Sequence, residues 1–105
     1  MTPESNLDAF ASAWVDGGLV LDVREVEEYR AGHVPGAPLV PLAKLPTWAD
    51  APPGRPMYVI CASGNRSLVA VDWMRARGID ARSVVGGTRG WARAGCSLVT
   101  GPHPH

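Results

Sequence analysis

The chain has 105 residues, of which 46% are hydrophobic and 19% are charged. This composition is typical of a single folded domain and excludes a disordered chain. The formal net charge is zero, which predicts no general affinity for nucleic acid or for a membrane surface. The charge is nevertheless uneven, because residues 1–50 hold eight acidic and three basic side chains, whereas residues 51–105 hold two acidic side chains and seven arginines. The basic half either favours a small anionic substrate or reflects solvated helix faces.

The two cysteines, Cys61 and Cys96, are too few for a disulfide framework. Residues 1–6 show no basic region followed by an apolar stretch, and no run of 18 apolar residues occurs. We therefore expect a cytoplasmic protein with no membrane partner. A single domain is expected over residues 1–105, with its core at about 5–101 and a frayed tail at 102–105.

Apolar patterning and turn residues predict strands and helices that alternate along the chain. The expected helices are Ser5 to about Asp16 (capped by Ser5), Glu25–Ala31, one turn at Pro41–Leu45, Leu68–Gly78 and Thr88–Ala94. The expected strands are Leu19–Leu21, Ala37–Val40, Met57–Ile60 and Arg82–Val85, with Thr47–Pro56 as a surface connection. This order predicts an α/β fold with a small central parallel sheet covered by helices on both faces. In the helix after residue 67, Val69 is expected on the apolar face together with Met74.

The polar loop Cys61–Ser67 lies between the buried strand Met57–Ile60 and the following helix. A loop that begins a helix at the carboxyl end of a strand aims backbone N–H groups at one point and favours an anion there. Such a site stabilises a cysteine thiolate, which is the nucleophilic form. Gly64 permits the positive φ that this loop needs. The alternative is an inert buried cysteine, and Arg66 either pairs with an anion or points to solvent.

Four segments, in order along the chain, resemble the signature segments of rhodanese-type sulfurtransferases. The loop Cys61–Ser67, with the sequence Cys-Ala-Ser-Gly-Asn-Arg-Ser, is similar to the family's active-site loop. The other segments are Leu21-Asp22-Val23-Arg24 with Glu28-Tyr29, Gly32-His33-Val34-Pro35-Gly36-Ala37 with Val40-Pro41-Leu42, and Gly86-Gly87 with Gly90-Trp91. The resemblance covers roughly residues 5–101 and implies the rhodanese-like fold.

The resemblance implies transfer of a sulfane sulfur through a persulfide on Cys61, the catalytic residue. The donor would be a small anion such as thiosulfate, and the acceptor cyanide, a cellular thiol or a protein. The substrate-binding residues would be those of the loop: Ala62, Ser63, Gly64, Asn65, Arg66 and Ser67. Arg66 would neutralise the donor or stabilise the persulfide. No metal, flavin or nucleotide cofactor is needed.

Several further residues are expected to support this site structurally. Asp22 and Arg24 are interpreted as a loop-tying pair rather than as catalytic groups. His33 is interpreted as a hydrogen-bonded turn residue rather than as a base or metal ligand, and Glu28 and Tyr29 are interpreted in the same way. The backbone of Gly86 and Gly87 is expected to form a wall of the pocket. Two tryptophans and one cysteine complete the set: Trp73 and Trp91 are expected in the core, and Cys96 as a passive thiol rather than a resolving one.

Two other functions are weighed against sulfur transfer. Cysteine-dependent phosphatases and arsenate reductases use a cysteine–arginine loop on related folds. Their loops typically place five residues between the cysteine and the arginine, whereas four lie between Cys61 and Arg66. Ile60 also stands where such phosphatases typically have histidine. The other alternative is a non-catalytic rhodanese-like sulfur carrier or interaction module. The sequence leaves the donor and acceptor open, and also whether Arg89 or Arg93 reaches the pocket.

Overall fold

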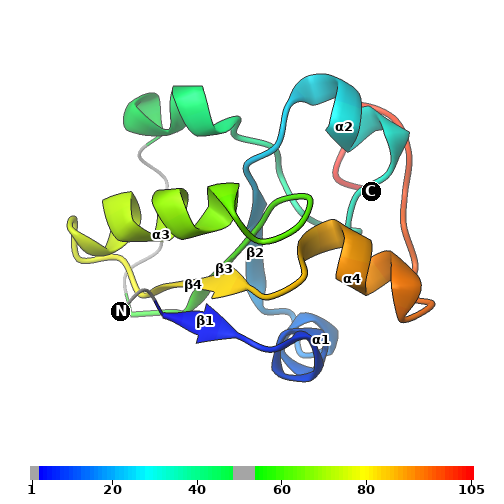
Figure 1. Cartoon of the computed structure of the whole chain (residues 1–105), viewed down its shortest axis with the longest axis horizontal. Helices are drawn as coiled ribbons and strands as arrows, with labels where there is room; N and C mark the ends of the chain where they lie inside the picture. Colours follow the sequence, from blue (N-terminus) through cyan, green and yellow to red (C-terminus); the bar gives the residue numbers. More distant parts are fainter. Residues whose placement is uncertain (1–2, 49–53) are drawn as a thin grey trace.

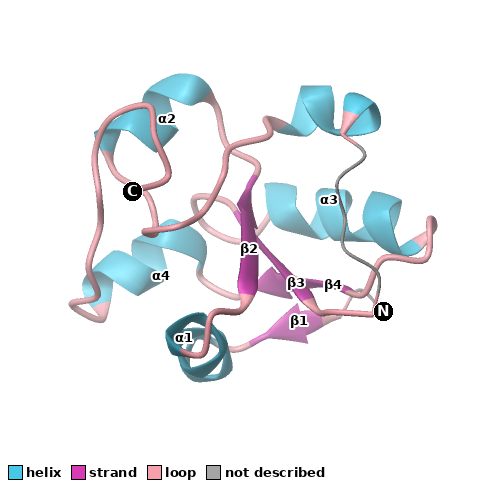
Figure 2. Cartoon of the chain, turned by 180° about the vertical axis from the view of Figure 1, so that it is seen from behind, coloured by secondary structure: helices cyan, strands magenta, loops and turns pink. Residues whose placement is uncertain are grey.

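A computed structural model describes residues 3–48 and 54–105 of the chain. Its four strands form one parallel sheet in the order β1-β4-β3-β2, with β3 and β4 at the centre (Figure 2). The strands are β1 (Glu4–Ser5), β2 (Leu19–Asp22), β3 (Met57–Ile60) and β4 (Ala81–Val84). The predicted α/β class is thereby confirmed.

Helices cover both faces of this sheet, as predicted. The helix α3 (Arg66–Arg75) and the 3₁₀ helix η1 (Leu42–Thr47) pack on one face, and α1 (Leu7–Val15) and α4 (Gly87–Arg93) pack on the other. A fifth element, α2 (Val26–Ala31), lies beyond the carboxyl end of β2 (Figure 1). Because β2 and β3 are parallel, α2 begins at the same end of the sheet as the residues that follow β3.

The central strand β3 is buried on both faces, which explains why its sequence is continuously apolar. Met57 and Val59 point into the cluster under α3, whereas Tyr58 and Ile60 point into the cluster under α1 and α4. The same alternation puts Cys61, the next residue, on the α3 side.

The start of the first helix and the strand predicted at Ala37–Val40 both differ from the structure. Ser5 does not cap α1 but belongs to β1, and the Asn6 side chain accepts the capping bond from Ala9 N–H at 2.7 Å. The predicted strand Ala37–Val40 is reduced to one bridge between Leu39 and Asp22. Pro38 has no N–H to donate and Pro41 follows immediately, so no longer ladder can form.

The predicted helices after residue 40 are present with shifted bounds. The turn expected at Pro41–Leu45 is the longer 3₁₀ helix η1, and the helix expected at Leu68–Gly78 begins two residues earlier and ends at Arg75. Val69 is 59% exposed rather than buried, because α3 buries Ser67, Ala70, Val71 and Met74 instead. Residues 49–53 of the predicted surface connection lie outside the described residues.

The aromatic residues and the tail fix the remaining contacts of the core. Trp91 is 1% exposed and packs against Phe10 in a tilted contact and against Trp14 edge to face. Trp73 is half-buried and lies under Arg77. The tail was expected to fray, but Gly36 N–H donates to Pro104 O at 2.8 Å and a ring nitrogen of His33 lies 2.8 Å from His103 O. Backbone and imidazole partners hold residues 103–104 in a way that composition does not indicate.

Candidate functional site

Cys61 is the first residue after β3, and its side chain is enclosed by the loop that leads into α3. The residue is 1% exposed, and Gly64 N–H donates to its Sγ at 3.1 Å. The Ser67 Oγ lies 3.4 Å from Sγ and 2.7 Å from the Oγ of Ser83 on β4. Ser67 and Ser83 are fully buried, so their two hydroxyls connect β4 to the Cys61 sulfur.

Two opposing effects set the pKa of Cys61. Burial raises the pKa of this thiol, because removal from water disfavours the thiolate. Hydrogen bonds from the Ser67 hydroxyl and from the backbone N–H groups of Ser67, Gly64 and Ser63 favour the thiolate and outweigh burial. The pKa of Cys61 is therefore lowered, and its surroundings favour the thiolate, the form that can act as a nucleophile.

Backbone contacts from α4 hold this loop from behind. Thr88 N–H donates to Cys61 O at 2.8 Å, and Arg89 N–H donates to Ala62 O at 3.0 Å. Gly87 has a φ of +58°, and a Cβ there would lie 2.5 Å from Cys61 O. Only glycine therefore allows this approach. Gly86 also lies against Gly64, so both glycines contact the cysteine loop, and the wall of a pocket expected from their backbone stays a prediction.

Arg66 points toward α2, where its guanidinium pairs with Glu28. Its two terminal nitrogens donate to the two carboxylate oxygens of Glu28, each at 2.7 Å. The Arg66 hydrogen bond lowers the pKa of Glu28 to about 2, with burial opposing and the Glu25 N–H assisting, and the pair in turn raises the pKa of Arg66. Glu28, expected to be a turn residue, thus joins α2 to the start of α3.

Asp22 and Arg24 form a buried ion pair beside the site. Arg24 Nη2 donates to Asp22 Oδ2 at 2.8 Å and to Gly32 O at 2.8 Å, which links the end of β2 to the end of α2. His33 stacks on Tyr29 at 3.6 Å between ring centroids, and its ring nitrogens lie against the carbonyl oxygens of Tyr29 and His103. These contacts fix the position of α2 against the end of β2 and the C-terminal tail.

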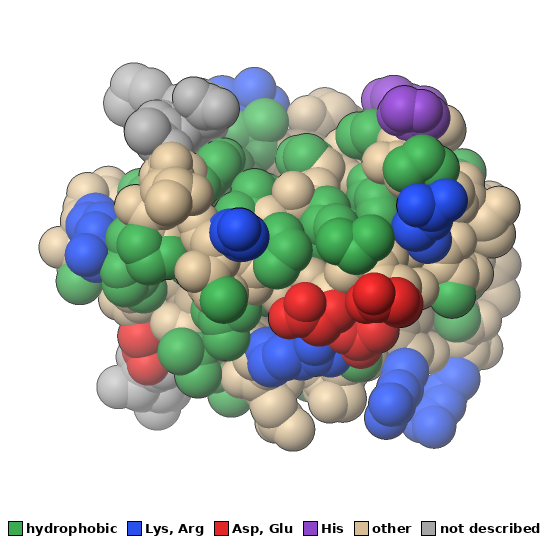
Figure 3. Space-filling model, turned by 90° about the horizontal axis from the view of Figure 1, so that it is seen from above, with side chains coloured by type: hydrophobic (Ala, Val, Ile, Leu, Met, Phe, Trp, Pro, Cys, Tyr) green, Lys and Arg blue, Asp and Glu red, His purple; other side chains and the backbone are tan. Residues whose placement is uncertain are grey.

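A hollow of about 300 Å³ opens beside the loop, between α2 and α4. Ala62, Thr88 and Arg89 line it on one side, and Glu28 and Ala31 line it on the other. Acidic side chains gather in one cluster on the face that includes α2, with basic side chains directly beside them (Figure 3). This hollow borders the cysteine loop at Ala62.

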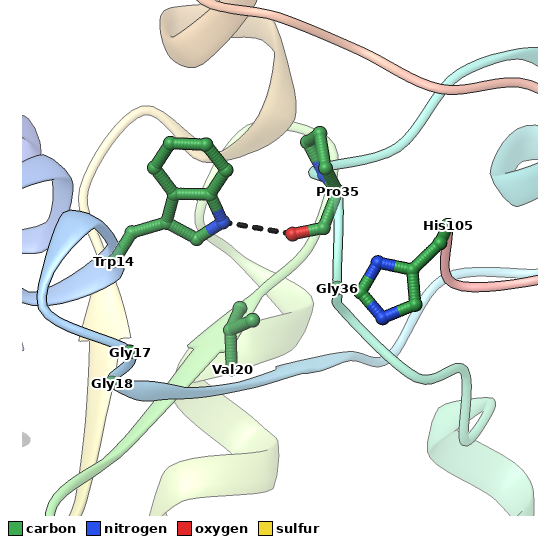
Figure 4. Close-up of a pocket in the computed structure, with 7 residues that line it drawn as sticks. All are labelled: Trp14, Gly17, Gly18, Val20, Pro35, Gly36 and His105. Atoms are coloured by element: carbon green, nitrogen blue, oxygen red, sulfur yellow. Dashed lines mark hydrogen bonds between the residues drawn. The ribbon is translucent and has the colours of Figure 1, made fainter.

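A second hollow lies at the opposite end of β2 and differs in chemistry. Its lining includes Trp14, whose Nε1–H donates to Pro35 O at 2.8 Å, together with Gly18, Val20 and the ring of His105 (Figure 4). Its lining contains no cysteine and lies at the amino end of the strand, so it does not share the Cys61 chemistry.

The described residues contain no group of three or more histidine, cysteine, aspartate or glutamate side chains able to hold a metal ion. Cys61 and Cys96 are both free thiols. Within residues 3–48 and 54–105, no helix has the length and apolar character that crossing a membrane requires.

The loop side chains divide into two groups. Ser63 and Asn65 are exposed, and the Asn65 side chain makes no capping bond, whereas Gly64 and Ser67 are buried against the sulfur. Sequence reasoning missed Ser83, because a serine in a strand carries no signal of its own until the fold places it beside Ser67. It also missed Thr88, which lines the hollow.

Comparison with known proteins gives a consistent result. The family described as "Rhodanese-like domain" matches residues 2–94. A Bacillus subtilis protein named "Putative sulfur carrier protein YrkF" is 38% identical over 94 residues, which are 85% of this chain and 50% of that protein. The chain thus spans half the length of this curated relative and a smaller part, 28%, of an Arabidopsis thaliana relative that carries a rhodanese-like and a PpiC domain.

Solved structures show the same fold. A rhodanese-related protein from Thermoplasma volcanium superposes with a TM-score of 0.87 at 29% identity, covering 94% of this chain and 99% of that one. A thiosulfate sulfurtransferase from Pseudomonas aeruginosa gives 0.83 at 27% identity and covers 95% of this chain, but only 20% of that larger protein.

Proposed function

The chain belongs to the rhodanese-like domain family, and we propose that it is a sulfurtransferase that carries a sulfane sulfur as a persulfide on Cys61. The observation that supports this most is the environment of the Cys61 sulfur, which faces backbone N–H groups of the loop and the Ser67 hydroxyl. These donors lower the pKa of the thiol and so favour the thiolate, which is the nucleophilic form.

With thiosulfate as the donor, the Cys61 thiolate attacks the outer sulfur atom. The bond between Cys61 Sγ and that sulfur forms, the sulfur–sulfur bond of thiosulfate breaks, and sulfite leaves with the bonding electron pair. The terminal sulfur of the persulfide carries the negative charge, and the loop N–H groups stabilise it. Cyanide then attacks this sulfur, thiocyanate leaves, and the Cys61 thiolate returns.

The role of Arg66 in this proposal differs from the expectation. Because Glu28 already neutralises the guanidinium, the charge of the donor is balanced mainly by the backbone of the loop. Arg66 instead fixes the first turn of α3, whose residue Ser67 contacts the sulfur. The same pairing argues against phosphatase chemistry, which needs a free arginine facing a phosphoryl group.

The physiological task is the second part of the proposal. A persulfide carrier must remain reduced between cycles, so we place the protein in a reducing compartment such as the cytoplasm. Cyanide, a cellular thiol or a partner protein can take up the sulfur. The name of the Bacillus subtilis relative favours one variant of this function, in which the chain carries sulfur to a protein acceptor and small-molecule turnover is slow.

The test is formation of thiocyanate from thiosulfate and cyanide by the wild-type chain, by Cys61→Ser and by Cys96→Ser. We expect thiocyanate from the wild type and from Cys96→Ser, and none above background from Cys61→Ser. Absence of thiocyanate, with sulfur still loaded on Cys61, would favour the carrier variant. Absence of both would contradict sulfur transfer.

A further inference from the structure

We propose that the hollow between α2 and α4 binds the carboxylate of a sulfur donor or of a thiol acceptor, and that Arg89 recognises this group. This inference rests on the proposed sulfur transfer and adds to it the chemical class of the substrate. Three observations support it: the hollow lies next to the cysteine loop, Arg89 has no ion-pair partner among the described residues, and the Thr88 hydroxyl has no hydrogen-bond partner there.

The hollow is joined to the cysteine loop through the backbone. Arg89 N–H donates to Ala62 O, Thr88 N–H donates to Cys61 O, and the side chains of both residues line the hollow together with Ala62. A molecule seated there lies next to the residue that follows the nucleophile. With a volume of about 300 Å³, the hollow fits the few heavy atoms of a small acid.

Arg89 differs from most arginines in the basic half of the chain. Arg66 pairs with Glu28, both Arg75 and Arg82 contact Asp80, Arg77 stacks on Trp73, and Arg55 donates to Gly17 O. Within residues 3–48 and 54–105, the guanidinium groups of Arg89 and Arg93 have no hydrogen-bond or ion-pair partner. Of these two exposed residues, Arg89 lines the hollow beside Ala62 and Arg93 does not.

Thr88 supplies the second, independent observation. The residue is 6% exposed, and its Oγ1 has no hydrogen-bond partner among the described residues. Buried hydroxyls are normally paired, and rotation of this side chain toward the hollow would give Oγ1 a partner on a bound acid. A carboxylate offers two acceptor oxygens, one for Arg89 and one for Thr88.

The neighbouring charges explain why the ligand should be a carboxylic acid rather than a larger polyanion. Glu28 and Arg24 also line the hollow, but Glu28 is paired with Arg66 and Arg24 with Asp22. Among the described lining residues, Arg89 is therefore the one cation whose guanidinium makes no hydrogen bond or ion pair. A single negative charge with a planar, two-oxygen acceptor matches its fork.

Two sources of this carboxylate are chemically equivalent at the hollow. A mercapto acid acceptor, as its thiolate, attacks the outer sulfur of the Cys61 persulfide and leaves as its own persulfide, while the Cys61 thiolate returns. A keto acid donor such as mercaptopyruvate delivers sulfur to the Cys61 thiolate, and the enolate of pyruvate leaves and takes a proton from water. Both steps hold the acid beside Ala62.

The test uses a reaction that needs no sulfur transfer. Iodoacetate and iodoacetamide both alkylate the Cys61 thiolate with loss of iodide, and they differ mainly in a carboxylate versus an amide. The ratio of their rates, followed by intact mass in a Cys96→Ser background, is compared between the parent, Arg89→Gln and Arg93→Gln. Arg93→Gln is the control, because it removes the same charge from α4 at a residue that does not line the hollow.

We expect Arg89→Gln to lower the iodoacetate-to-iodoacetamide ratio about tenfold, as for loss of a charge-assisted hydrogen bond, and Arg93→Gln to leave it unchanged. Thr88→Val should lower the ratio by about threefold, the size expected for a neutral hydrogen bond. Equal ratios in all variants, or equal losses from Arg89→Gln and Arg93→Gln, would overturn the proposal. Neither result depends on whether thiocyanate is formed.

The source of the acid is separated by turnover. For the acceptor, sulfur transfer to 3-mercaptopropionate is compared with transfer to its neutral amide; for the donor, loading from mercaptopyruvate is compared with loading from thiosulfate. Arg89→Gln should slow the reaction of 3-mercaptopropionate more than that of its amide, or the reaction of mercaptopyruvate more than that of thiosulfate. If neither acid depends on Arg89 in a chain that does transfer sulfur, the substrate assignment is wrong.

Discussion

Cys61 lies at the carboxyl end of the buried strand β3, whereas Cys96 follows the short helix α4 and is half-buried. The Cys61 sulfur accepts a hydrogen bond from Gly64 and lies against the Ser67 hydroxyl. The Cys96 thiol packs beside the aromatic cluster of Phe10 and Trp91 and makes no hydrogen bond to any residue in 3–48 or 54–105. The same side chain is the nucleophile of the proposed function in one place and a packing group in the other.

The difference comes from the backbone rather than from the side chains nearby. A loop between a parallel strand and a helix turns its N–H groups inward, and here it does so around the residue that ends the strand. Cys96 follows the C-terminal end of a helix, where carbonyl oxygens predominate and disfavour an anion. Substitutions that displace the loop N–H groups or remove the Ser67 hydroxyl should therefore reduce the difference between the two thiols.

The largest effect is expected from Gly87→Ala. The added Cβ would lie 2.5 Å from Cys61 O, and φ there is +58°, so the loop must move away from α4. Removing aligned donors from a reacting anion costs roughly a hundredfold in rate, and we expect a loss of that size in thiocyanate formation.

Gly95→Ala is the matched control for Gly87→Ala. Its φ is +80°, but a Cβ there meets nothing within 4 Å. We expect it to cost about 1 kcal/mol in unfolding free energy from backbone strain, with activity close to wild type. Equal activity losses in the two variants would show that the contact beneath the cysteine loop is unimportant.

Ser67→Ala should have the next largest effect. It removes the hydroxyl that favours the Cys61 thiolate over burial, so the pKa of Cys61 should rise. The rate of iodoacetamide alkylation at Cys61, measured against pH, should then reach its plateau at higher pH than in the wild type.

Ser63→Ala serves as the control for this profile, because that side chain is exposed and only its backbone faces the sulfur. Ser83→Ala should shift the profile in the same direction as Ser67→Ala but less, since Ser83 acts through Ser67. An unshifted profile for Ser67→Ala would contradict the assigned role of the hydroxyl.

Glu28→Gln should have a smaller effect on stability, and one that depends on pH. The folded pKa of Glu28 is lowered from 4.5 to about 2, so its ion pair stabilises the fold above pH 4.5 and is lost as pH falls toward 2. The difference in melting temperature between wild type and Glu28→Gln should follow this course. Both side chains of the pair are more than a third exposed, so the contribution is at most about 1 kcal/mol. A difference that grows as the pH falls would have the wrong sign.

Cys96→Ser should have the smallest effect. Its thiol lacks a polar partner in the described part of the chain and borders the aromatic cluster, so the exchange replaces one small side chain with another of similar volume. We expect unchanged sulfur loading at Cys61, measured by mass after thiosulfate treatment. A clear loss of loading would assign Cys96 a role as a resolving thiol.

Sequence patterns predicted the part of the site that is local in the chain. An apolar run, a polar loop with Gly64 and a following helix are continuous in sequence, so their physical consequences can be read from neighbouring residues. Partners that depend on tertiary structure could not be found in this way. Glu28 meets Arg66 across 38 positions and Ser83 meets Ser67 across 16, and neither pair has a spacing signal.

The remaining misses have similarly specific causes. The two-residue strand β1 is defined by its pairing with Ser83 and Val84 rather than by its own composition. The proline-flanked segment around Leu39 has strand-like residues but lacks the N–H groups for a ladder. Val69 is apolar and exposed, because helical periodicity alone does not say which residues at the margin of a face are covered.

The most direct test of sulfur transfer is the location of the sulfur gained from thiosulfate. The reduced chain is treated with thiosulfate, blocked, digested and analysed by peptide mass, and a second sample is discharged with cyanide first. We predict one additional sulfur atom on the peptide that contains Cys61, none on the peptide that contains Cys96, and loss of the addition after cyanide. Sulfur on Cys96, or on neither cysteine, would contradict the proposed role of the loop.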